Sequence, residues 1–118
     1  MFVSRMCDIA KLAVLPALIS GIGQAPAGTA SAVTLRISIK DHRFQPAELK
    51  VPANTPVTLV VRNLDPAPEE FESNTLRVEK VVAGNSEITL NFRPLAPGRY
   101  RFYGDFNEAT AHGAITAE

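Results

Sequence analysis

Apolar and polar residues alternate along most of the chain after residue 32. In the run VTLRISIK, residues 33–40, one valine, one leucine and two isoleucines share one face, and polar side chains share the other. The same period of two recurs in VTLVVRN, SEITLNF, RYRFY and the closing run GAITAE. Because a period of two places successive side chains on opposite sides of an extended backbone, each run predicts a half-buried β-strand. No amphipathic helix longer than about two turns is predicted.

Short clusters of turn-forming residues separate the predicted strands. PAN, LDPAP, AGN and APG each combine residues that favour turns. Short, half-buried strands at regular spacing predict an all-β fold, a Greek-key antiparallel β-sandwich. The run LAPGRY, Leu95 to Tyr100, is similar to the tyrosine corner of such sandwiches, in which the Tyr hydroxyl bonds to backbone a few residues upstream. Tyr100 is therefore expected to have a structural role.

The first 32 residues have the order of a secretory signal peptide. Arg5 and Lys11 give a basic start, the apolar run LAVLPALISGIG follows, and small residues end in Ala30-Ser31-Ala32. We predict cleavage after Ala32, which leaves residues 33–118 as one domain in the periplasm. The apolar run is shorter than the ~20 residues that span a bilayer, so the alternative of an uncleaved anchor is less favoured. The cleaved protein is not expected to span the membrane itself.

Charge and cysteine content exclude several classes of function. Lys and Arg total 12 and Asp and Glu total 12, so no net field attracts nucleic acid. The single cysteine is Cys7, inside the predicted signal peptide. Residues 33–118 therefore contain no disulfide, no thiolate ligand and no thiol nucleophile. Since there is also no Ser-His-Asp arrangement and no phosphate-binding glycine loop, we do not expect an enzyme.

Three segments together resemble the cupredoxin superfamily. They are FQPAELKV from Phe44, VTLVVRNLD from Val57, and LAPGRYRFY from Leu95. Their order and spacing are similar to the strands that lead into the metal-binding loops of that superfamily, over nearly all of residues 33–118. The resemblance implies a cupredoxin-like sandwich, and it implies that Asn63 braces the two loops by side-chain hydrogen bonds.

The four ligands of a blue-copper centre, two His, one Cys and an axial Met, have no counterparts here. The first His of the family follows a proline, and here Glu69 follows Pro68. The Cys position corresponds to Gly104, the second His to Asn107 and the Met to Ala111. Because no Cys or Met occurs after Ala32, a type 1 blue-copper site is not expected.

The sequence around these altered positions is similar to that of the cupredoxins linked to bacterial iron uptake, a branch that includes EfeO-type proteins. PEEFESNTL and VEKVV resemble that branch, whose ligand sets are rich in carboxylates. The resemblance implies a periplasmic role in iron or copper handling, with a membrane permease or a periplasmic iron-transport protein as partner. Several relatives carry Asp-Phe-His in the second loop, where this chain has Asp105-Phe106-Asn107.

Acidic residues gather in two segments that we expect to be loops, in the place of the copper loops of the superfamily. The first contains Glu69, Glu70 and Glu72, and the second contains Asp105, Glu108 and then His112. A cupredoxin fold brings both segments to one end of the sandwich. Oxygen ligands with one imidazole suit iron, or Cu(II) in a site that is not blue. Neighbouring carboxylates repel each other when no cation is bound.

We predict that Glu70 and Asp105 bind an iron or copper ion together, with Glu69 and His112 as supporting ligands. The alternative for each acid is an exposed carboxylate that pairs loosely with an arginine, and His112 could instead bond to backbone. Glu79 is a further acid of the kind common in the iron-linked branch. Two other functions remain open: a metal-free interaction module on a cupredoxin scaffold, or a small enzyme subunit.

Overall fold

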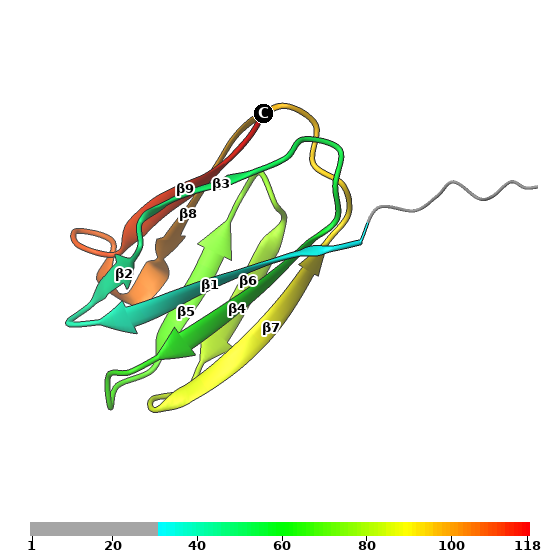
Figure 1. Cartoon of the computed structure of the whole chain (residues 1–118). Coiled ribbons are helices and arrows are strands. Elements are labelled where there is room, and N and C mark those ends of the chain that lie inside the picture. Colours follow the sequence, from blue (N-terminus) through cyan, green and yellow to red (C-terminus); the bar gives the residue numbers. More distant parts are fainter. Residues whose placement is uncertain (1–30) are drawn as a thin grey trace, which may run out of the picture.

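The computed structural model describes residues 31–118, and these form a two-layered sandwich of β-sheets (Figure 1). The elements are β1 Val33–Lys40, β2 Arg43–Gln45, β3 Glu48–Val51, β4 Val57–Asn63, β5 Glu69–Ser73, β6 Val78–Val82, β7 Ser86–Phe92, β8 Gly98–Gly104, the single-turn helix η2 Asp105–Asn107, and β9 His112–Ala117. Apart from Ser31 and Ala32, the predicted signal peptide lies outside the described residues. Among residues 31–118, no helix is long and apolar enough to cross a bilayer.

One sheet has four strands in the order β2-β1-β4-β7, and the other has five in the order β3-β9-β8-β5-β6. The prediction of an all-β sandwich is confirmed. The prediction of antiparallel pairing holds for most neighbours, but β1 pairs with β4 in parallel, as does β3 with β9. After β2 the chain crosses to the other sheet as β3 and returns as β4, so β4 runs in the direction of β1.

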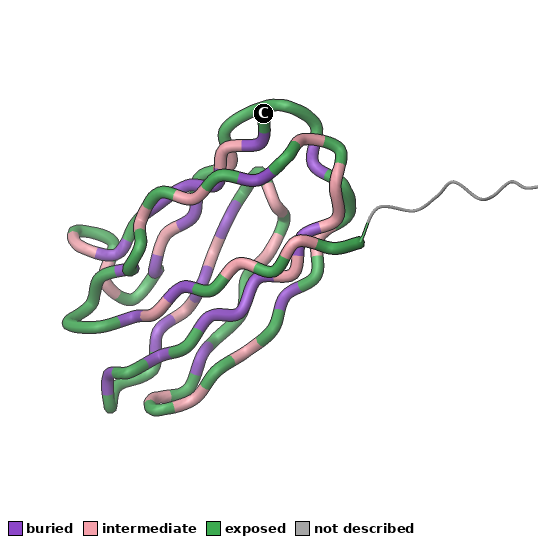
Figure 2. Tube along the Cα trace, in the orientation of Figure 1, coloured by how far each residue is buried: buried purple, intermediate pink, exposed green. Residues whose placement is uncertain are grey.

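Alternating side chains fill the space between the two sheets, as the sequence predicts. Figure 2 shows buried and exposed positions alternating along several strands. Three phenylalanines form the aromatic centre of the core: Phe44 and Phe71 meet edge to face at 5.9 Å, and Phe71 stacks on Phe102 at 5.1 Å between ring centroids. Phe71 and Phe102 belong to adjacent strands of the five-stranded sheet. This cluster holds β5 and β8 against the opposite sheet.

Tyr100 and Asn63 have the structural roles predicted for them. The Tyr100 hydroxyl donates to the carbonyl oxygen of Ala96 at 2.6 Å, which is the bond of a tyrosine corner. The buried Asn63 amide donates to the carbonyl oxygens of Ala67 and Val82, at 2.8 and 3.1 Å. Asn63 thus joins the segment before β5 to the end of β6, and it fixes the point at which β5 begins.

Candidate functional site

The four residues that the superfamily resemblance places at the blue-copper ligand positions lie together at one end of the sandwich. Glu69 begins β5, and its Oε2 accepts a hydrogen bond from the Asn107 side-chain amide at 2.7 Å. The Gly104 N–H donates to the Ala111 carbonyl oxygen at 2.8 Å. A Cβ on Gly104 would lie 2.6 Å from Glu69 Cδ and 2.8 Å from Ala111 Cβ. The Glu69 carboxylate therefore fills the space beside Gly104, the position that the resemblance assigns to the cysteine ligand.

The Glu69 carboxylate is buried, with the residue only 1% exposed, and both of its oxygens accept hydrogen bonds from other groups of the protein. Oε1 accepts the backbone N–H groups of Glu70 at 3.0 Å and Phe106 at 2.9 Å. Oε2 accepts the Asn107 amide. Buried polar groups are stabilised when they are bonded in this way. This hydrogen-bonded arrangement ties β5 to the helix η2, in the place where the superfamily resemblance implies a ligand.

The prediction that the first group of acids lies on a loop is wrong. Glu69, Glu70 and Glu72 belong to the strand β5, and the period of two divides them between its two faces. Glu69 points into the sandwich, whereas Glu70 and Glu72 point outward. The structure thus separates Glu69 from Glu70, although we predicted both as ligands of one ion.

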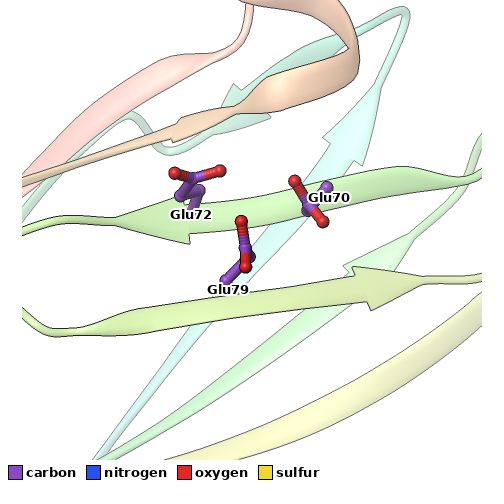
Figure 3. A group of neighbouring side chains, drawn as sticks. All are labelled: Glu70, Glu72 and Glu79. Carbon is purple, nitrogen blue, oxygen red and sulfur yellow. The ribbon is translucent and has the colours of Figure 1, made fainter.

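On the outer face, Glu70 and Glu72 meet Glu79 of the neighbouring strand β6 (Figure 3). We call these three residues the glutamate cluster. One carboxylate oxygen from each lies within 4.8 Å of the other two. The strand register causes this proximity, because Glu72 and Glu79 are direct cross-strand partners and Glu70 lies two residues along the same face. The spacing suits a shared cation with oxygen ligands.

Electrostatic repulsion is present in the glutamate cluster. Partial burial raises the pKa of Glu70, and the negative charges of Glu79, Asp105 and Glu72 raise it further. Asp105 lies on η2, which follows β8, so this contribution comes from a different segment of the chain. The charge of Asp105 thus acts on Glu70, but among residues 31–118 the carboxylates close enough to share one ion are those of Glu70, Glu72 and Glu79, without Asp105.

Tyr103 is a polar neighbour of the cluster that the sequence analysis did not include in the site. Its hydroxyl donates to Glu72 Oε2 at 2.8 Å. This hydrogen bond, followed by burial and the charges of nearby acids, raises the pKa of Tyr103 to about 12. The alternation of RYRFY does predict that Tyr103 faces outward, but only the pairing of β5 with β8 reveals that it lies opposite Glu72.

His112 lies on the same outer face, one strand beyond Tyr103. It begins β9, it is exposed, and its direct partner on β8 is Tyr103. Since neighbouring strands are about 4.8 Å apart, His112 is two strands, or roughly 10 Å, from Glu72. The structure places His112 beside the glutamate cluster and not within it.

The comparisons with known proteins agree with this fold. Residues 11–117 match the cupredoxin-like domain, and the chain belongs to this family. An uncharacterised protein, RP394, of Rickettsia prowazekii (strain Madrid E) is 43% identical over 81 residues, which cover 69% of this chain. The chain spans 65% of the length of that relative.

Solved structures with the same fold include copper proteins. Auracyanin A, a "blue" copper protein of Chloroflexus aurantiacus, is 15% identical with a TM-score of 0.64, over 75% of this chain and 100% of that protein. The metal-binding domain of the Cu(I)-exporting P-type ATPase CopA of Streptococcus pneumoniae D39, solved with Cu(I), is 18% identical with a TM-score of 0.60, over 72% and 84%. A purple cupredoxin of Nitrosopumilus maritimus is 18% identical with a TM-score of 0.53, over 70% and 98%.

The bond between Tyr103 and Glu72 predicts an unusual tyrosine titration. In the native protein the Tyr103 phenol should stay protonated until the pH approaches its pKa of about 12. Because the folded-state pKa is raised, the bond contributes stability below pH 10, and this contribution is lost as the pH rises through the folded pKa. Glu72→Gln should move the pKa back toward 10.0. Carbon-13 NMR of the tyrosine ring, assigned with Tyr103→Phe, measures both values; equal values would contradict the structure.

Proposed function

We propose that this protein is a periplasmic, cupredoxin-like metal carrier that serves iron or copper uptake through a membrane permease. It holds the ion by carboxylates on the outer face of the five-stranded sheet. The observation that carries this proposal is the glutamate cluster, in which an oxygen from each of three carboxylates lies within 4.8 Å of the others. The protein delivers an ion and does not act as an enzyme.

The chemistry of the cluster favours a hard or borderline cation. Three carboxylates in contact repel one another, and a bound cation removes that repulsion. Asp105 adds a fourth negative charge near Glu70, and Tyr103 adds a phenol oxygen on Glu72. Oxygen donors of this kind suit iron, manganese or Cu(II) in a tetragonal site. Because the cluster lies on an exposed face, the ion can be exchanged with a partner, as a carrier requires.

The proposal of transport rests on the resemblance to iron-linked cupredoxins and on the predicted signal peptide. PEEFESNTL and VEKVV, the segments that carry the resemblance, are the segments that supply Glu70, Glu72 and Glu79. The copper named for auracyanin A and for the CopA domain supports a metal role for the scaffold. The described residues contain no Cys or Met, so the ion would be held without a thiolate.

A titration with metal ions tests the proposal. Purified protein should bind Mn(II), Fe(II) or Cu(II) in calorimetry, and Glu79→Gln should weaken binding at least about tenfold, because one charged ligand is lost. Glu79 is exposed and its side chain makes no hydrogen bond that β6 needs, so the variant should fold. The affinity for the ion should decrease as the pH is lowered, because the carboxylates become protonated. This decrease should begin at a higher pH than for an ordinary carboxylate, because the pKa of Glu70 is raised.

The matched control is Glu87→Gln, which removes an exposed glutamate from β7 of the other sheet. Its affinity should equal that of the unchanged protein. If the unchanged protein binds none of the three ions, or if Glu87→Gln weakens binding as much as Glu79→Gln, the carrier proposal is wrong.

A second candidate function is a metal-free docking module. Two observations favour it: Glu69 and Asn107, which the resemblance places at ligand positions, are hydrogen-bonded to each other, and the neighbouring Phe106 is 51% exposed. In this case the end of the sandwich would contact a partner protein directly. A failed metal titration would favour this candidate.

A further inference from the structure

A hollow next to the glutamate cluster is lined by two arginines, an asparagine, a threonine and a tyrosine, and carbon atoms of these side chains make up much of its surface. Its volume is about 350 Å³, and its lining residues are Asn74, Thr75, Arg99, Arg101 and Tyr103. The hollow forms because β5 and β8 are paired only at Phe71–Gly104 and Glu72–Tyr103, after which the chain turns away at residues 74–77. The outward side chains of β8 at 99, 101 and 103 are thus left facing an open space.

Positive charge in this hollow is only partly neutralised. Arg99 is committed to Glu48 through two hydrogen bonds, of 2.8 and 3.1 Å. Arg101, two residues along the same face, forms no ion pair and no side-chain hydrogen bond with any residue in 31–118. Its electrostatic effect is on Glu48, whose pKa is lowered by Arg99 and further by the charge of Arg101. Asn74 and Thr75 add a side-chain amide and a hydroxyl. A guanidinium beside neutral donors is a set of groups that recognises a carboxylate, which arginine can bind through two parallel bonds.

We propose that this hollow binds a small anion that carries carboxylate groups, with Arg101 as the main contact. Tyr103 lines the hollow, and its hydroxyl also bonds to Glu72 of the glutamate cluster. One residue thus connects an anion site to a cation site on the same sheet face. A further step rests on the proposed function. The protein receives the metal as a complex with a polycarboxylate. A carboxylate of this complex that does not bind the metal contacts Arg101, while the ion contacts the glutamate cluster.

Citrate is the probe for the anion site, used without metal and at constant ionic strength. Calorimetry or NMR titration of the purified protein should show citrate binding, and Arg101→Gln should weaken it at least about tenfold because a two-bond contact is lost. Arg36→Gln, which removes an exposed arginine from β1 of the other sheet, is the matched control and should leave affinity unchanged. The inference would be overturned if sulfate bound as tightly as citrate, or if both variants lost the same amount of citrate affinity.

The metal titration separates this inference from the proposed function. Arg101→Gln should bind Mn(II) alone as well as the unchanged protein does, because no guanidinium contacts the ion. If Mn(II) binds and citrate does not, the anion site is wrong and the carrier proposal stands. If citrate binds and no ion does, the carrier proposal is wrong and the hollow is an anion site without a metal. If both bind, Mn(II) should increase the affinity for citrate; an unchanged affinity would overturn delivery as a complex.

Discussion

Replacing Phe71 by alanine should lower the free energy of unfolding by about 3–5 kcal/mol, the usual cost of deleting a buried phenylalanine ring. Phe71 is fully buried, at 0% exposure, and packs against both Phe44 and Phe102. The ring lies between Glu70 and Glu72 in the chain, so it also fixes the strand that presents them. Urea denaturation measures the loss, and Phe71→Leu supplies a measurable variant if the alanine variant is unfolded.

Phe106→Ala is the matched control for the loss of a phenylalanine ring. Phe106 is 51% exposed on η2, and surface substitutions of this kind usually change stability by less than about 0.5 kcal/mol. A small effect of Phe71→Ala, comparable to that of Phe106→Ala, would mean that β5 does not pack in the core as described.

Replacing Glu69 by alanine should destabilise the protein by about 1–3 kcal/mol, because three partly buried donors lose their acceptor. The backbone N–H groups of Glu70 and Phe106 and the side-chain amide of Asn107 all donate to this carboxylate. Their loss should also release η2, which hydrogen exchange at the Phe106 amide reports. Denaturant unfolding gives the change in stability.

Glu69→Gln separates the hydrogen bonds from the charge. The amide oxygen can still accept from the backbone, and the Asn107 amide can turn to offer its oxygen, so the loss should be smaller than for alanine. If Glu69→Ala is as stable as the unchanged protein, the hydrogen bonds between Glu69 and residues 70, 106 and 107 do not stabilise the fold.

The fold was largely predictable from the sequence, for a physical reason. Each strand of a two-layered sandwich has one face in the core and one in water, and alternation such as that of residues 33–40 records this directly. The parallel pairing of β1 with β4 was not predictable from alternation, because the pattern is the same in both directions. It depends on the crossing of the chain between the sheets.

The candidate site was predictable only in part. Acidic residues in both segments were visible in the sequence, and Asp105 does lie close enough to Glu70 to raise its pKa. Side chains alternate between the two faces of a strand, so the direction of each acid depends on its place in β5. We expected a loop there, for which no such alternation can be predicted. The contact between Glu72 and Glu79 depends on the register of β5 and β6 across a turn. A shift of one residue would have turned Glu79 to the other face.

The location of a bound ion tests the central claim most directly. We propose that the ion binds on the outer face of the five-stranded sheet, and that the hydrogen-bonded Glu69 fills the position that the resemblance assigns to a ligand. Crystals of the protein soaked in Mn(II) can be measured for anomalous scattering. We predict a peak between the carboxylates of Glu70, Glu72 and Glu79, with the bond from Asn107 to Glu69 intact. A peak beside Glu69, with its carboxylate turned away from Asn107 and onto the ion, would contradict this account.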